Sequence, residues 1–186
     1  MAGSVAAMWA WAVDRITNYS CAYTQSLEVS PGAPYGKRNM GYVDGKYWFD
    51  CASFVYFALI GGGFPAGDYY GSGHYAPNVT GLVNILPQMG FTSYPAASST
   101  WQAGDILIKY RTHTEICYAP PSRTMGAHST AGGVTINDDD SIKSYYDVLF
   151  RYEQGPGPDP PGPQPGPTVP MPIWLLKRAI EIQRGG

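Results

Sequence analysis

The amino-acid sequence predicts an α+β domain in which N-terminal helices pack on an antiparallel sheet of about five to six strands. Three observations support this class. Apolar residues recur at helical spacing before residue 90, and they alternate with a period of two after residue 104. Glycine and tyrosine are frequent, with 23 and 15 residues among 186, which suits strands joined by long loops.

The first predicted helix covers residues 4–18, where Val5, Trp9 and Ile16 lie on one face. A single apolar face indicates that this helix covers one side of the domain. Residues 19–49 show no regular period and are rich in Gly, Tyr and Pro, so we expect irregular structure there.

Two further helices are expected before the sheet. Residues 51–60 are apolar nearly all round, which predicts a buried helix. Asp50 is its expected N-cap, and the three glycines at 61–63 are its expected stop. Residues 78–89 form the third predicted helix, with Asn78 as its cap.

Short runs with a period of two follow in the second half of the domain, and turn residues separate them. Neighbouring runs joined by short turns pair in the antiparallel direction. The expected strands are residues 105–110, 114–119, 124–129, 133–136 and 148–152.

The end of this domain is marked by a change in composition. Residues 1–154 form the expected main domain. Residues 155–172 contain nine prolines and four glycines, so they cannot pack a core and are expected to form an extended linker. Residues 173–186 resume an apolar pattern at helical spacing, which is interpreted as the start of a second, truncated module.

Charge and hydropathy limit the partners. A net charge of −2 and a pI near 5.8 offer no basic surface for phosphates, so no nucleic-acid partner is expected. No apolar run is long enough to span a membrane, so no membrane insertion is expected. The N-terminus lacks a basic region, and Asp14 and Arg15 interrupt it early. We therefore expect no signal peptide and synthesis in the cytoplasm.

The three cysteines are Cys21, Cys51 and Cys117, and their odd number argues against a disulfide framework. Cys51 falls at the first turn of the predicted buried helix. The partial positive charge of a helix N-terminus stabilises a thiolate, so Cys51 is a candidate nucleophile. The alternative interpretation is a small buried core residue, which is the usual place of a free cysteine.

A cysteine nucleophile needs a base, and the base needs an orienting partner. His113 stands where a strand begins, and His128 lies in the next predicted strand, so antiparallel pairing would bring them together. Each is alternatively a structural histidine, and His74 is expected in a loop. The same residues could bind zinc, but no compact ligand motif is present, so we expect no metal and no cofactor.

Four segments together resemble the NlpC/P60 cysteine peptidases, in particular their phage endolysin branch. They are AYTQ at 22–25, WFDCASFVYFAL at 48–59, HTEICY at 113–118 and MGAHST at 125–130. The resemblance covers roughly residues 5–150 and implies a papain-like NlpC/P60 fold. It also implies that residues 1–154 are a catalytic domain and that residues 173–186 begin a truncated wall-binding module.

The resemblance implies a role for each matching residue. Cys51 matches the nucleophile, His113 the general base, and His128 the polar residue that orients His113. Tyr23 matches the tyrosine near the oxyanion position, although Tyr35 is a rival for that role.

Three further residues are expected to contact substrate or the oxyanion, namely Gln25, Asp50 and Glu115. Glu115 shares the strand face of the base, where it could orient that base, meet substrate or remain a solvated carboxylate. Ala52 stands where the family usually has Ser, which puts recognition of a free substrate amine in doubt.

The resemblance implies a phage endolysin that hydrolyses an amide bond in the stem peptides of peptidoglycan. The expected bond is the D-γ-glutamyl–diamino acid bond, and the alternative is the N-acetylmuramoyl–L-alanine amide. The expected target is the wall of a Gram-positive host, reached after holin-mediated release. A bacterial secreted wall amidase and a non-catalytic wall-binding module are further alternatives.

Overall fold

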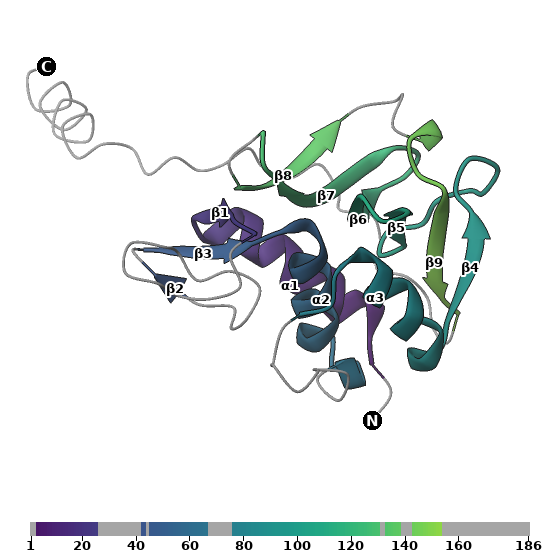
Figure 1. Cartoon of the computed structure of the whole chain (residues 1–186), viewed down its shortest axis with the longest axis horizontal. Helices are drawn as coiled ribbons and strands as arrows, with labels where there is room; N and C mark the ends of the chain where they lie inside the picture. Colours follow the sequence, from purple (N-terminus) through teal and green to yellow (C-terminus); the bar gives the residue numbers. More distant parts are fainter. Residues whose placement is uncertain are drawn as a thin grey trace, which may run out of the picture.

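The computed structural model of the chain describes residues 3–25, 42–43, 45–66, 76–130, 133–138 and 143–153. Three helices lie against one side of a six-stranded antiparallel sheet (Figure 1), which is the predicted α+β arrangement. The predicted linker, the predicted C-terminal helical segment, Tyr35 and His74 lie outside the described residues.

The helices match the sequence predictions closely. Helix α1 covers Val5–Asn18, α2 covers Cys51–Gly61, and α3 covers Val79–Ile85. The third helix ends earlier than predicted, because Pro87 begins a separate 3₁₀ turn, Pro87–Met89. None of the helices that the structure describes has the length and apolarity needed to span a membrane.

Helix α2 is the centre of the domain and packs between α1 and α3 (Figure 1). Its residues from Cys51 to Leu59 are all buried, as the uniformly apolar pattern predicts. Asp50 caps its N-terminus: the carboxylate accepts the Ser53 backbone N–H at 2.7 Å, and the Ser53 hydroxyl accepts the Asp50 N–H at 2.9 Å. This reciprocal capping fixes where the helix begins, and it therefore fixes the position of Cys51.

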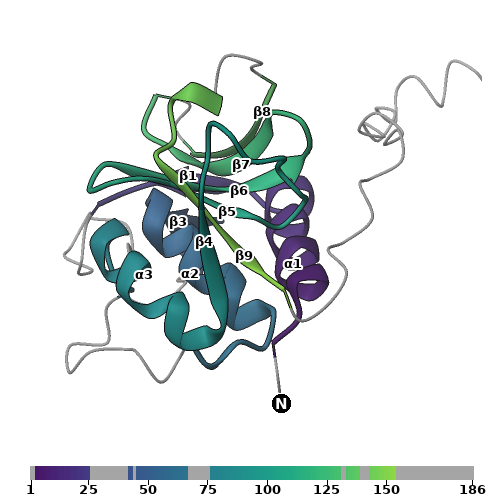
Figure 2. The ribbon, with the colours of Figure 1, turned by 90° about the vertical axis from the view of Figure 1, so that its right-hand side faces the viewer.

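The main sheet has the strand order β4-β9-β5-β6-β7-β8, with all neighbours antiparallel (Figure 2). Five of its strands lie close to their predicted positions. The sixth, β4, was not predicted. The strands are β4 Phe91–Pro95, β5 Ile106–Lys109, β6 His113–Ala119, β7 Arg123–His128, β8 Gly133–Asp138 and β9 Val148–Tyr152.

A second, three-stranded sheet stands in the region predicted to be irregular, so that prediction was wrong in part. It has the order β1-β3-β2, formed by β1 Cys21–Tyr23, β2 Tyr42–Val43 and β3 Lys46–Phe49. The pairing of β1 with β3 is parallel and joins segments far apart in sequence, so local periodicity gives no sign of it. A Cβ on Gly133 would lie 2.2 Å from the Cys21 carbonyl oxygen, which shows how closely β1 approaches β8.

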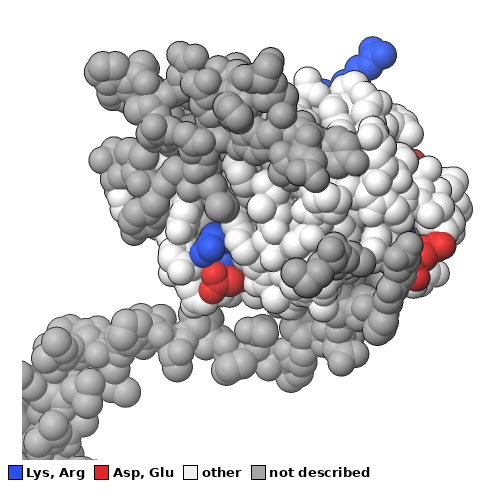
Figure 3. All heavy atoms as spheres, turned by 90° about the horizontal axis from the view of Figure 1, so that it is seen from below, with Lys and Arg blue, Asp and Glu red and all other residues white. Residues whose placement is uncertain are grey.

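Apolar side chains form two clusters, and the period of two along the strands divides residues between them. Ile106 and Ile108 of β5 belong to the larger cluster around α2, whereas Leu107 belongs to a smaller one with Trp101. Seen from below, the described surface carries few charged side chains (Figure 3), in keeping with the 14% charged residues of the chain.

Candidate active site

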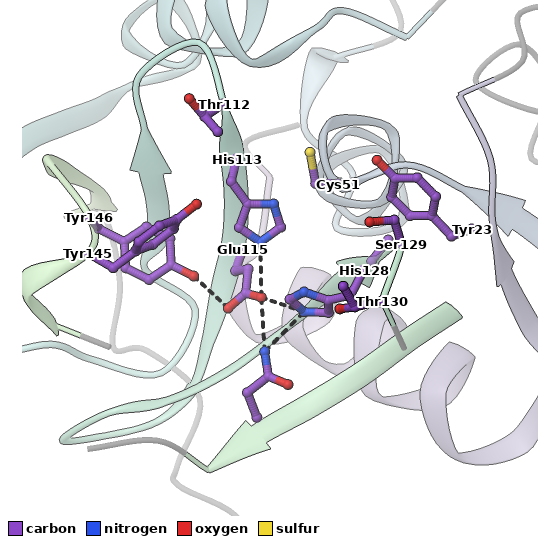
Figure 4. A pocket seen from close by; sticks show the side chains of 12 residues that line it. Tyr23, Cys51, Thr112, His113, Glu115, His128, Ser129, Thr130, Tyr145 and Tyr146 are labelled. Carbon is purple, nitrogen blue, oxygen red and sulfur yellow. Dashed lines mark hydrogen bonds and ion pairs between the residues drawn. The ribbon is translucent and has the colours of Figure 1, made fainter. Parts of the chain in front are cut away.

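Cys51 opens into a cavity of about 410 Å³. As the first residue of α2 it is mostly buried, with 8% of its surface exposed. Figure 4 shows that side chains from the small sheet, α2 and strands β6 to β8 converge on this cavity. Its lining residues are Tyr23, Cys51, Thr112, His113, Glu115, Ala127, His128, Ser129, Thr130, Asn137, Tyr145 and Tyr146.

His113, the first residue of β6, links the thiol to a carboxylate. Its Nε2 lies 3.2 Å from Oε1 of Glu115, and an interaction with the thiol of Cys51 contributes to the pKa of His113. Because Nε2 is used by Glu115, Nδ1 is the nitrogen left for the thiol (Figure 4). Burial alone would lower the pKa of His113, but the hydrogen bonds and negative charges of Cys51 and Glu115 outweigh it and raise the pKa to about 9.

Glu115 is fully buried and receives hydrogen bonds from several elements. Nε2 of His128 lies 2.5 Å from Oε1, Nδ2 of Asn137 donates to Oε1 at 3.2 Å, and the Tyr146 hydroxyl donates to Oε2 at 2.7 Å. Burial alone would raise the pKa of Glu115, but the hydrogen bonds, led by those of His113 and His128, lower it to about 2. The carboxylate is therefore ionised near neutral pH, and the solvated-carboxylate interpretation is wrong.

Gly126 on β7 makes room for this carboxylate. A Cβ built at Gly126 would lie 2.7 Å from Cγ of Glu115 and 3.2 Å from its Oε1. Residues Ile116 and Met125 are paired in the ladder between β6 and β7, which places Gly126 opposite Glu115. A side chain at this position would displace Glu115 from His113, so glycine is required here for steric reasons.

His128 lies beside His113, as the expected antiparallel pairing of their strands predicts. Its expected role in orienting His113 stays a prediction: Nε2 of His113 faces Glu115, and Nε2 of His128 lies near both Glu115 and Asn137. The two imidazole rings have centroids 5.1 Å apart and are tilted by 49°. Because both rings use Nε2 toward the same Glu115 oxygen, that carboxylate lies between them (Figure 4).

The other predicted site residues differ in whether they line the cavity. Tyr23 lines the cavity, and its hydroxyl accepts a hydrogen bond from Nε2 of Gln25 at 3.0 Å. Asp50 is only 3% exposed, and its carboxylate serves the helix cap. Gln25 and Asp50 are not among the described lining residues of the cavity, and their substrate-binding roles stay predictions.

Sequence reasoning missed Asn137, Tyr146 and Gly126. The predicted strand at 133–136 stops one residue short of Asn137, which the structure includes in β8. Tyr146 lies between strands, where no periodicity marks it. A signal was available for Gly126, because a glycine inside a predicted strand often marks the close approach of another group.

His113, Glu115 and His128 are the described residues that could hold a metal ion. Their ligand atoms lie within 4.8 Å of one another. However, the same atoms already take part in hydrogen bonds with Cys51, Asn137 and Tyr146. The donor set is therefore satisfied as a hydrogen-bonded network that can hold and move a proton.

Comparison with known proteins gave two solved structures of interest. The peptidoglycan hydrolase RipB from Mycobacterium tuberculosis is 17% identical, with a TM-score of 0.47 over 78% of this chain and 64% of RipB, less than two thirds of that chain. The P60 domain of an antigen from M. avium subspecies paratuberculosis is 15% identical, with a TM-score of 0.46 over 78% of this chain and 94% of that domain. No family model matches the sequence. No curated protein matches it either.

Proposed function

We propose that this chain is a cysteine hydrolase of the NlpC/P60 type that cleaves an amide bond in the peptide part of bacterial peptidoglycan. The observation that carries this proposal is the continuous line from Cys51 through His113 to Glu115 in one cavity. A thiol, an imidazole and an orienting carboxylate are the three parts that nucleophilic amide hydrolysis requires. The four sequence segments that resemble the family contain all three residues.

The chemistry begins with proton transfer from Cys51 to Nδ1 of His113. The raised pKa of His113 favours its protonated imidazolium form near neutral pH. The thiolate attacks the scissile carbonyl carbon, and the carbonyl oxygen becomes an oxyanion. Backbone N–H groups at the start of α2 stabilise that oxyanion, each contributing about 2.7–4 kcal/mol, and Tyr23 borders the same cavity.

Collapse of this intermediate breaks the C–N bond and leaves a thioester on Cys51. Nδ1 of His113 donates its proton to the leaving amine, so the amine departs neutral. His113 then takes a proton from water, and the hydroxide attacks the thioester and releases the acid product. Glu115 holds the imidazole in place and stabilises its charged form throughout these steps.

In this proposal Glu115 takes the orienting role that was expected of His128. Nε2 of His128 lies 2.5 Å from Oε1 of Glu115, so His128 acts on His113 through that carboxylate. No metal takes part in any of these steps.

The proposed substrate bond is the D-γ-glutamyl–diamino acid bond. We further propose that the chain is a phage endolysin that acts on the wall of a Gram-positive host. The phage branch is supported by the order and spacing of the motifs. The alternative is the N-acetylmuramoyl–L-alanine amide. The hydroxyl-bearing lining of the cavity, which includes Tyr23, Ser129 and Tyr145, would suit a sugar.

Mass spectrometry of digested peptidoglycan tests the proposal. Walls treated with the wild-type chain should show a new amine on the diamino acid, and walls treated with Cys51→Ala should show none. A new amine confined to L-Ala would establish the muramoyl amidase instead. Undigested walls from several Gram-positive species would contradict the hydrolase assignment.

A further inference from the structure

A second cavity borders the turn that joins β5 to β6. Its volume is about 340 Å³, and it is lined by Thr80 and Val83 of α3 and by Tyr110 and Arg111 of the turn. The next residue, Thr112, lines the catalytic cavity. Because consecutive Cα atoms are only about 3.8 Å apart, a single short turn separates the two cavities. The turn at residues 110–112 therefore contributes lining residues to both cavities.

The backbone of this turn is strained at Arg111. Its φ is 62°, and among the described residues it is the one non-glycine residue with positive φ. The turn is held by the Thr112 N–H donating to the Lys109 carbonyl at 3.0 Å, and by Asp147, which pairs with Lys109 at 2.9 Å. Glycine would adopt this conformation without the penalty of about 1–3 kcal/mol that other residues incur. A strained residue with a functional group suggests a role for its side chain.

The guanidinium of Arg111 is also unused within the described part of the chain, where it has no hydrogen bond or ion pair. In contrast, Arg151 pairs with Asp105 at 2.6 Å. A guanidinium binds carboxylates through two parallel hydrogen bonds, which gives both affinity and geometric selectivity. The hydroxyl of Thr80 adds a donor beside it, and the side chains of Val83 and Tyr110 add apolar surface for carbon atoms of a ligand.

We propose that this second cavity is a subsite for a free carboxylate of the substrate peptide, which Arg111 binds. The inference rests on the proposed function and refines it. In a γ-glutamyl amide the side-chain carbonyl is scissile, and the α-carboxylate stays free a few carbon atoms away. The acyl side of the muramoyl–L-alanine amide carries no such group. A carboxylate subsite beside the catalytic cavity therefore selects the D-γ-glutamyl–diamino acid bond.

The test compares two synthetic peptides, L-Ala–γ-D-Glu–diamino acid with its glutamyl α-carboxylate free and the same peptide with a carboxamide there. The wild-type chain should cleave the carboxylate peptide with a kcat/KM roughly tenfold or more higher, as one charge-assisted hydrogen-bonded pair gives. In Arg111→Gly the ratio of the two values should fall to near one, and Arg111→Lys should keep part of it. Lys46→Gln makes a matched change of charge on β3, at a residue that lines neither cavity, and should keep the wild-type ratio.

Loss of folding is not expected to account for the result, because Arg111→Gly relieves backbone strain and should have a Tm at or above that of the wild type. Equal cleavage of both peptides by the wild-type chain, or a preserved ratio in Arg111→Gly, would overturn the subsite. If neither peptide is cleaved, the proposed function fails, and calorimetric titration of Cys51→Ala with both peptides still decides the subsite. Tighter binding of the carboxylate peptide that is lost in Arg111→Gly/Cys51→Ala supports it, and equal binding overturns it.

Discussion

Cys51 and Cys117 are both buried, but their surroundings differ completely. Cys117 lies in the smaller apolar cluster with Trp101, Leu107 and Leu149. Burial strongly raises the pKa of its thiol, and the charge of Asp105 raises it further. Cys51 instead meets a histidine whose far nitrogen is bound to a carboxylate.

The same contrast runs along one face of strand β6. His113, Glu115 and Cys117 follow one another at every second position, so they share that face. The first two belong to a polar network, whereas Cys117 belongs to an apolar cluster. Cys21 resembles Cys117, because burial raises the pKa of its thiol to about 11. In the proposed mechanism the difference in reactivity between the thiols comes from the paired imidazole and carboxylate, since burial alone keeps a thiol neutral.

The largest effect is expected from the cysteines themselves. Cys51→Ala should abolish wall lysis in zymography while its circular dichroism and Tm stay close to wild type. Cys117→Ser and Cys21→Ser should remain active, although Cys117→Ser should be less stable because it buries a hydroxyl in an apolar cluster. Substantial lysis by Cys51→Ala would remove the basis of the comparison.

Replacing the carboxylate tests why the two thiols differ. Glu115→Gln keeps the size of the side chain but removes the charge that raises the pKa of His113. We expect kcat/KM to fall by roughly 10²–10⁴-fold, the usual contribution of a positioned acid–base group. The alkaline limit of activity should also move to lower pH. A variant with the wild-type rate and pH profile would show that Glu115 is structural only.

A smaller effect is expected from Tyr146→Phe, which removes one donor from Glu115. The pKa of the carboxylate should rise, so the acid-side midpoint of kcat/KM should shift to higher pH. Tyr56→Phe is the matched control, because the Tyr56 hydroxyl donates to the Ala66 carbonyl in the core. Both variants should lose about 1–3 kcal/mol of stability, but only Tyr146→Phe should move the midpoint. Equal pH profiles would exclude a positioning role for Tyr146.

The dependence of stability on pH gives the smallest and most selective signal. The pKa of Glu115 is lowered from 4.5 to about 2, so its contribution is present above pH 4.5 and is lost as pH falls toward 2. The pKa of His113 is raised from 6.5 to about 9, so its contribution is present below pH 6.5 and is lost as pH rises through 9. Urea unfolding at a series of pH values across these two ranges measures the contribution of each group to the free energy of unfolding. An unchanged acid-side loss in Glu115→Gln would assign that loss to another carboxyl group.

The sequence predicted the elements whose signal is local. The uniformly apolar run after Asp50 predicts a buried helix that begins at Cys51, and alternation after residue 104 predicts most of the main sheet. The parallel pairing of β1 with β3 escaped prediction, because it depends on contacts between distant segments.

The candidate site shows the same difference between features with a local sequence signal and features that depend on distant contacts. Cys51 and His113 were candidates from their motifs, and the structure places both in one cavity. Alternation put Glu115 on the strand face of His113, where the two side chains are in contact. The burial of Glu115 was not predictable, because it depends on Gly126 across the ladder and on Tyr146 from a later loop. Those contacts are set by strand register, which a single sequence does not reveal.

The most direct test of the account is the order in which the three thiols react. The folded chain would be treated with limiting iodoacetamide at neutral pH, and alkylated positions would be mapped by peptide mass spectrometry while lysis is measured in parallel. The account predicts that Cys51 is modified first and that lysis falls in proportion, with Cys21 and Cys117 unmodified. Earlier modification of either of those residues, or full lysis by protein alkylated at Cys51, would contradict it.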